Sequence, residues 1–108
     1  MSAAGRFLRK VETGYLHWCP GCESAHHIWV GNASGPNWSF DGNVDAPTFN
    51  PSVRVFTPAY KDEDCEIPET TECHYFIRAG KIEFCGDSAH DLRGQTVPLP
   101  EFPENYGY

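Results

Sequence analysis

The stretch Cys19-Pro20-Gly21-Cys22 decides the fold of this chain. Two cysteines that flank Pro-Gly can turn both sulfur atoms and several backbone N–H groups toward one cation, and the glycine permits the tight turn. Residues 14–18, before this turn, alternate aromatic with other residues, and residues 27–30, after it, are rich in aromatic and β-branched residues. Both runs are typical of short strands. The segment therefore predicts a hairpin that resembles a zinc ribbon, with a Zn²⁺ ion at its turn.

A pair of buried thiols or a redox dithiol is the alternative explanation of the CxxC motif. Redox motifs of this kind accompany a βαβ pattern, which the sequence around Cys19 does not have. The chain has an odd number of cysteines and lacks the apolar N-terminal stretch that a secretion signal requires. We therefore expect a cytoplasmic protein, and in a reducing cytoplasm thiols bind metal rather than form a disulfide framework.

The remainder of the chain predicts a mostly β protein. Nine prolines and ten glycines in 108 residues favour turns over long helices. Alternating runs at 52–57, 73–77, 81–85 and 96–99 predict strands, with a tight hairpin turn at 78–80. We expect a small single-domain antiparallel β fold over residues 1–108, with a zinc-ribbon-like CxxC knuckle.

Three segments are expected to contribute least to the core. Residues 1–12 are predicted to form a short strand or a loose N-terminal arm. Residues 58–72 are acidic, contain proline and lack periodicity, which predicts an acidic surface loop. Residues 103–108 are predicted to be a tail.

Composition also limits the partners of this protein. The net charge of −7 argues against nucleic-acid binding, because affinity for phosphate backbones depends on clustered Lys and Arg. No segment is apolar over the length of a transmembrane helix, so no membrane partner is expected. A protein or peptide partner is the remaining expectation.

Tetrahedral zinc needs two ligands besides Cys19 and Cys22. The candidates are His26, His27, Cys73, His74, Cys85 and His90. Cys73 and His74 are neighbours on a predicted strand, where consecutive side chains point to opposite faces. We therefore do not expect both to bind one ion, and we predict Cys73 as the third ligand because a distant cysteine commonly completes such a site. His26 is the predicted fourth ligand.

The roles of several other histidines and cysteines stay open. His26 and His27 are equally well explained as polar positions on a half-exposed strand. Cys85 is a reserve ligand, although a lone free cysteine is more often a small buried residue. Cys65 lies in the acidic segment and is expected to take no part.

A second group of polar residues has the composition of a serine hydrolase. Such an enzyme needs a base within hydrogen-bond reach of the serine and a third group that orients the base. Ser52 opens one predicted strand and His74 opens the neighbouring hairpin, so these two residues form a plausible pair. Asp87, Ser88 and His90 share one turn, which makes Ser88 with His90 a competing pair and lets Asp87 orient either histidine. The residues alone do not choose between the pairs.

Two further explanations apply to the same residues. Serine and aspartate in turns and at strand starts are used in most proteins as local caps. A metal hydrolase, in which His74, Asp87 and His90 bind zinc with an open position, is the other alternative, although no HExxH motif supports it.

Four motifs, WCPGCESAHH, WSFDGNVDAPTFNPS, CHYFIRAGKIEF and DSAHDLRGQTVPLP, together resemble a family of small phage and bacterial zinc-knuckle proteins of unknown function. The resemblance covers residues 14–102. Some members carry an ammonia monooxygenase label, which would require copper or iron ligands and membrane spans that this sequence does not offer. Members of the family also resemble proteins encoded beside bacterial ubiquitin-like conjugation systems. That resemblance implies a peptidase that trims or releases a ubiquitin-like protein, in a bacterial host cytoplasm if the gene is phage-encoded.

The family pattern has matching positions throughout this chain. They are Cys19, Cys22, His26, Cys73, His74, Asp87 and His90, with 47–49, 51–52 and 94–96. Ser88 stands where relatives have Ser or Cys, which makes Ser52 the stronger candidate for a nucleophile.

The sequence thus leads to one preferred hypothesis and two alternatives. We expect a zinc-stabilised serine-type peptidase that acts on a peptide or ubiquitin-like tail, with Ser52 as nucleophile, His74 as base and Asp87 or His90 as support. One alternative is a non-catalytic zinc-ribbon module that binds a protein through exposed aromatic side chains. The other is a zinc-dependent hydrolase in which the metal is the catalyst.

Overall fold

The computed structural model describes residues 2–31 and 35–104, and all regular elements in this part of the chain are β-strands. In chain order they are β1 (Ser2–Ala4), β2 (Leu8–Val11), β3 (Gly14–Cys19), β4 (Ser24–Trp29), β5 (Ser39–Phe40), β6 (Phe49–Thr57), β7 (Tyr60–Lys61), β8 (Glu66–Ile67), β9 (Thr70–Arg78), β10 (Lys81–Phe84) and β11 (Thr96–Pro98). Every strand pair is antiparallel. The predicted mostly β, antiparallel fold is confirmed. With no helix among the described residues, this part of the chain contains no helical membrane span.

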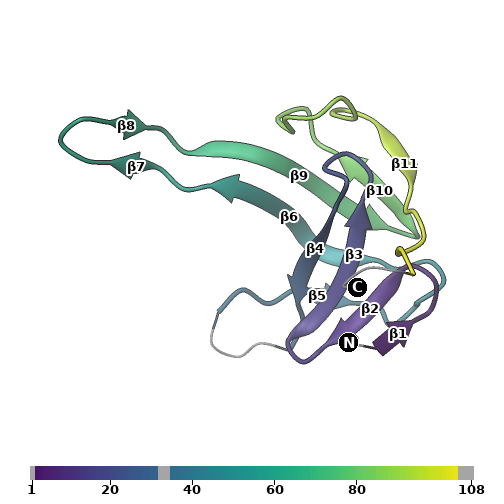
Figure 1. Ribbon diagram of the computed structural model, residues 1–108. Coiled ribbons are helices and arrows are strands. Elements are labelled where there is room, and N and C mark those ends of the chain that lie inside the picture. The colour runs from purple at the N-terminus through teal and green to yellow at the C-terminus, as the bar shows by residue number, and fades with distance from the viewer. Residues whose placement is uncertain (1, 32–34, 105–108) are drawn as a thin grey trace.

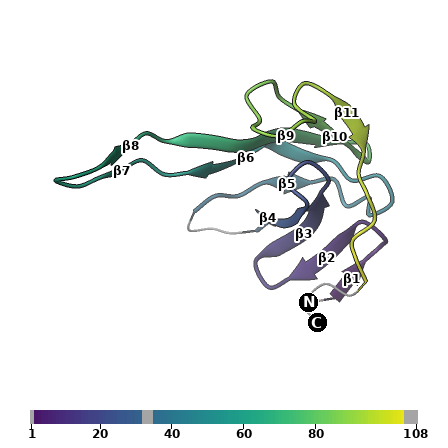
Figure 2. The same ribbon diagram turned by 45° about the horizontal axis from the view of Figure 1, so that its top comes forward.

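Two sheets pack face to face around the core (Figure 2). The first has the strand order β1-β2-β3-β4, and the second has the order β11-β10-β9-β6-β5. Apolar side chains from both sheets are buried between them, because alternate residues of each strand point inward. The largest include Leu8, Ile28, Phe49, Tyr75, Ile77 and Ile82.

β9 is the central strand of the second sheet, and its two faces have different environments. Cys73, Tyr75 and Ile77 are buried on the face that meets the first sheet, whereas His74 and Phe76 are only half-buried. Adjacent side chains on β9 therefore lie on opposite faces of the sheet, because side chains alternate in direction along a strand.

The ladder between β6 and β9 is irregular where Ser52 lies. Phe49 pairs with Ile77 and Val53 pairs with Tyr75, so β6 has two more residues than β9 between these pairs. This irregular segment contains a cis peptide bond between Asn50 and Pro51. The indole N–H of Trp38 donates to the carbonyl oxygen of Ser52 at 3.1 Å, which ties the segment to the residues before β5.

The N-terminal segment, predicted as a short strand or a loose arm, is paired as strands in the structure. β1 pairs with β2 and β2 pairs with β3, so residues 2–11 extend the first sheet. The anchor is Leu8, whose side chain is fully buried in the core. Burial of this side chain contributes about 2 kcal/mol, and strand pairing with the packed side chains of Ala4 and Phe7 adds to it.

The acidic segment 58–72 is more regular than the sequence predicted. β7 and β8 pair at the tip of a long arm that continues the β6 and β9 ribbons away from the body (Figure 1). The side chain of Asp62 accepts the backbone N–H groups of Asp64 and Cys65 and so closes the turn. The side chains of 58–70 are exposed, as expected of an acidic surface segment, but the backbone is a hairpin. Of the predicted tail 103–108, residues 105–108 lie outside the described residues.

Candidate functional site

Two clusters of reactive side chains lie on opposite faces of β9. One contains Ser52, His74 and Asp87, and the other contains cysteines and a histidine. Both clusters also draw on the turn that follows β10. Their chemistry differs, because the first offers a hydroxyl group beside a base and the second offers ligands for a metal ion.

Ser52, His74 and Asp87 form a continuous chain of side-chain contacts. The Oγ atom of Ser52 lies 3.1 Å from Nε2 of His74. On the other side of the ring, Nδ1 of His74 lies 3.1 and 3.2 Å from the two carboxylate oxygens of Asp87. The histidine side chain is 26% exposed and the aspartate side chain 54%, so solvent reaches this site.

The backbone around His74 holds these groups in place. Ser88, which is buried, accepts a hydrogen bond from the His74 N–H and donates one to the His74 carbonyl, both at 3.0 Å. The N–H of Cys85 donates to the same carbonyl at 2.8 Å. The turn carrying Asp87 is thus fastened directly to the strand carrying His74. The hydroxyl of Ser88 is engaged with backbone atoms, and the structure does not bring it together with His90 as a pair.

This arrangement can activate a hydroxyl group. When Nδ1–H of a neutral His74 donates to Asp87, the lone pair of Nε2 faces the Ser52 hydroxyl and can take its proton. The Asp87 carboxylate then stabilises the imidazolium that forms. The geometry is that of a Ser-His-Asp triad, in which the aspartate is unusually open to water.

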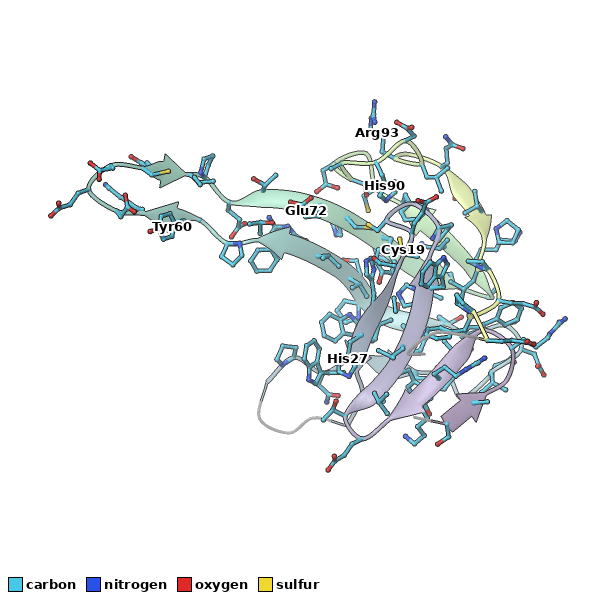
Figure 3. The ribbon with its side chains drawn as sticks, in the orientation of Figure 1. Cys19, His27, Tyr60, Glu72, His90 and Arg93 are labelled. Carbon is cyan, nitrogen blue, oxygen red and sulfur yellow. The ribbon has the colours of Figure 1, made fainter. Side chains whose placement is uncertain are left out.

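The second cluster consists of Cys19, Cys22, Cys73 and His90, whose ligand atoms all lie within 4.8 Å of one another. Cys19 ends β3, Cys73 lies on β9 and His90 follows β10, and Figure 3 shows Cys19 and His90 at the same end of the molecule. The Cys73 sulfur is 3.8 Å from that of Cys19 and 3.3 Å from Nε2 of His90. The N–H of Cys22 donates to the Cys19 sulfur at 3.4 Å.

Gly21 makes room for the histidine of this cluster. A Cβ atom at position 21 would lie 2.2 Å from Cε1 of His90 and 2.4 Å from its Nε2, closer than real contacts allow. The glycine of the knuckle is therefore required by the close approach of an imidazole ring.

The electrostatics of the cluster suit a cation. The hydrogen bond with the Cys73 thiol lowers the pKa of Cys19 to about 6. Burial raises the pKa of Cys22 to about 11, and the hydrogen bond with Cys19 together with burial raises the pKa of Cys73 far above its usual value. Ionisation of all three thiols without a cation is unfavourable, because their negative charges would repel one another.

A set of three thiols and one imidazole fits a tetrahedral zinc ion. The N–H of Leu92 donates to Nδ1 of His90 at 3.2 Å, which turns Nε2 toward Cys73. With a metal ion at Nε2 the ring proton would lie on Nδ1, and the Leu92 N–H could then no longer donate to that nitrogen. Zinc bound here would hold together β3, β9 and the turn after β10.

His26, the predicted fourth ligand, is not in this cluster; the structure puts His90 in that position. Nδ1 of His26 lies 3.1 Å from the Tyr75 hydroxyl, inside the core. Burial lowers the pKa of His26. The reason is that β4 leads away from the knuckle, and His26 pairs across the hairpin with His17 instead of lying beside the thiols.

The remaining candidate residues lie outside the sites for which they were considered. His27 lies on the other face of β4, where Nε2 is 2.9 Å from the Thr13 hydroxyl, and Cys65 is exposed on the arm. His90 packs with the cysteines, so it is not placed as a support for His74 or as a member of a metal site with Asp87. Cys85 is not in the zinc cluster either.

Sequence reasoning missed the position of Cys85. Its sulfur belongs to a group with His74 and Asp87 in which the ligand atoms lie within 4.8 Å of one another. The signal was present in the hairpin, where a turn with positive φ at Ala79 and Gly80 pairs Tyr75 with Phe84. One step further along this ladder, Cys85 stands opposite His74.

The comparisons with known proteins give one match. A family model described as "Bacterial ubiquitination-like system serine protease (BubE)" matches residues 2–85. The matched range includes Ser52, His74 and the three clustered cysteines, while Asp87 and His90 lie just beyond it. No curated protein and no solved structure matches the chain.

Proposed function

The chain belongs to the family of serine proteases of bacterial ubiquitination-like systems, and from this premise we propose that Ser52 is its nucleophile. In this proposal His74 is the general base and Asp87 orients and stabilises His74. The observation that carries the proposal is the unbroken chain of contacts from Ser52 Oγ through both ring nitrogens of His74 to Asp87. Three residue types in this order are what acyl transfer by a serine requires.

The proposed reaction has two stages. Ser52 Oγ attacks the carbonyl carbon of the scissile bond while its proton passes to Nε2 of His74. The imidazolium then gives that proton to the departing amine or alcohol, which leaves an acyl group on Ser52. Water, deprotonated by the same histidine, releases the acyl group and restores the serine. Asp87 remains ionised throughout and keeps the Nδ1 proton of His74 in place.

The proposed substrate is a protein with a ubiquitin-like tail. Besides the family, an apolar groove beside β6 supports a peptide substrate, because Trp38 both lines this groove and donates to the Ser52 carbonyl. Extended peptides are well suited to such a groove, where aromatic walls bind side chains. The groove is lined by Ala25, His26, His27, Trp29, Trp38 and residues 53–56.

We further propose a structural zinc ion at Cys19, Cys22, Cys73 and His90. Its support is the donor set and the close approach of His90 to Gly21. Cys73 precedes His74 directly on β9, so an ion that fixes Cys73 also fixes the backbone from which the general base projects. In this role the metal stabilises the protein and takes no part in bond cleavage.

A fluorophosphonate probe and a ubiquitin-like protein with a C-terminal extension provide the test. The wild-type protein should react with the probe at Ser52 and cleave the extension, and both Ser52→Ala and His74→Ala should abolish cleavage. Ser39→Ala is the matched control, because Ser39 is an exposed serine on the adjacent strand β5 whose hydroxyl donates to the Asn50 carbonyl. A folded Ser52→Ala protein that keeps its labelling and its cleavage rate would overturn the proposal.

A further inference from the structure

Cys85 is a reactive side chain that the proposed reaction does not use. It follows β10 directly and lies opposite His74 in the extended ladder, with its N–H bonded to the His74 carbonyl at 2.8 Å. Residues directly opposite each other in an antiparallel pair carry their side chains on the same face of the sheet. The thiol of Cys85 therefore shares the outer face of β9 with the imidazole of His74.

The three side chains His74, Cys85 and Asp87 offer a sulfur, a nitrogen and a carboxylate oxygen within 4.8 Å of one another. This mixed donor set is one that zinc accepts in proteins, with water as the fourth ligand. The site is also open to incoming ions, since Asp87 is exposed and His74 and Cys85 are only partly covered. None of these three residues belongs to the cysteine cluster on the opposite face of β9.

Resting on the proposed function, we propose that His74, Cys85 and Asp87 form a second zinc site, and that Zn²⁺ bound there inhibits the peptidase. Nδ1 is the ring nitrogen of His74 that faces Asp87, so it is the nitrogen that the ion would take. Binding requires the Cys85 thiol to release its proton to solvent. The proton on Nδ1 of His74 must also leave, and by exchange with water Nε2 gains one. Only S–H and N–H bonds are broken and remade, so removal of the ion restores the enzyme.

Inhibition follows from where the protons of His74 must then lie. In the active arrangement Nδ1 carries the proton and Nε2 offers its lone pair to Ser52. A neutral imidazole that coordinates zinc through Nδ1 must carry its proton on Nε2. Nε2 then has no lone pair with which to accept the Ser52 proton, and Asp87 no longer contacts an Nδ1–H group. The base is inactivated without any movement of the nucleophile.

The second site should bind zinc more weakly than the cysteine cluster. It has one sulfur ligand instead of three, and its ligands lie at the surface, where water competes for the ion. A protein that keeps the ion of the cysteine cluster can therefore be titrated with additional zinc. Such a site would make activity depend on free zinc while the fold remains intact.

Calorimetric titration with ZnCl₂ tests the site itself, using protein that retains its tightly bound zinc. We expect wild-type and Ser52→Ala proteins to bind one further equivalent. Cys85→Ala should weaken that binding at least about ten-fold. Cys65→Ala is the matched control, since it removes an exposed thiol from the distant arm and should bind as the wild type does. Equal binding by Cys85→Ala and wild type would overturn the proposal, whatever the activity of either protein.

The inhibition is tested by zinc titration of cleavage, with each variant normalised to its own rate in the absence of added zinc. Zinc should reduce cleavage by the wild type and by Cys65→Ala, a mild chelator should restore it, and Cys85→Ala should need at least about ten-fold more zinc for half inhibition. A rate that rises with added zinc and depends on Cys85 would contradict inhibition and indicate a catalytic metal. Absence of cleavage from all proteins would contradict the proposed function, while the calorimetric titration would still decide the existence of the site.

Discussion

The substitution Asp87→Asn tests how the proposed triad works, because it removes a charge and keeps the size of the side chain. The carboxylate lies 3.1 Å from Nδ1 of His74 and is 54% exposed. When His74 takes the Ser52 proton, a positive charge forms on the ring about 4 Å from the carboxylate charge. At that separation the attraction is about 1 kcal/mol in water and about 4 kcal/mol at an effective dielectric constant near 20.

The exposure of Asp87 favours the lower part of this range, about 1–2 kcal/mol. A loss of this size corresponds to a fall of about 5- to 30-fold in kcat. In a buried triad the same substitution costs roughly 10⁴-fold, because the wrong tautomer of histidine is then stabilised. Here the amide oxygen of asparagine can still accept the Nδ1 proton, and water can solvate the imidazolium. We therefore expect a graded effect for Asp87 and an all-or-none effect for Ser52.

The assay is kcat for cleavage, measured with protein whose active sites have been counted with the fluorophosphonate probe. Salt provides a second measurement, since an exposed ion pair is screened and the gap between wild type and Asp87→Asn should narrow as ionic strength rises. Asp91→Asn is the control, because it removes an exposed carboxylate from the same loop. A fall as large as that of His74→Ala would refute the reasoning from exposure. An unchanged kcat would show that Asp87 has no part in the reaction.

Three further predictions concern stability and metal binding. His90→Ala should weaken zinc binding at the cysteine cluster by at least about 100-fold, measured by competition with a chromophoric chelator. His26→Ala should leave the zinc stoichiometry unchanged and the affinity within a few-fold of the wild-type value. Gly21→Ala should reduce the free energy of unfolding of the zinc-loaded protein by about 1–3 kcal/mol in urea, because the new methyl group overlaps the His90 ring. Burial lowers the pKa of His17 to about 3, so between pH 6.5 and 3 the unfolded chain binds a proton that the folded chain does not. Stability should therefore fall by up to about 5 kcal/mol as the pH drops through this window. A His17→Gln protein with the same zinc content should lose that part of the pH dependence, measured by urea unfolding at pH 7 and pH 4.

The sequence predicted correctly those features of the structure that depend on adjacent residues of one strand or hairpin. Because Cys73 and His74 are adjacent on a predicted strand, their thiol and imidazole were expected on opposite faces of it. The hairpin around 78–80 was also readable, since its short turn fixes the register between 73–77 and 81–85. The same register sets Cys85 opposite His74, a pairing that the sequence-based prediction overlooked. These features depend on the period of a strand and on one turn, and both are encoded in adjacent residues.

Local sequence patterns could not predict contacts between segments that are distant in the sequence. The choice of His90 over His26 depends on how the turn after β10 folds back over Gly21, a packing event between residues about 70 positions apart. The spacing in the sequence favoured the nearer histidine, but the direction of β4 carries it into the core. The arm was missed for a different reason. Its strands β7 and β8 have two residues each and are held by backbone pairing among exposed side chains, which leaves no hydrophobic period to detect.

The turn after β10 connects the two clusters physically. Within four residues it directs Asp87 toward His74, Ser88 onto the backbone of β9, and His90 toward the thiols on the other face. An ion bound at His90 would therefore restrain the same turn that carries Asp87. Loss of that ion would release the turn at one end while the Ser88 hydrogen bonds hold it at the other. Because catalytic groups must be held to within a fraction of an ångström, we expect the metal to influence kcat through the position of Asp87 even where the fold survives. His90→Ala combined with Asp87→Asn should then lower kcat by less than the product of the two separate effects, because both substitutions act on the same contact with His74.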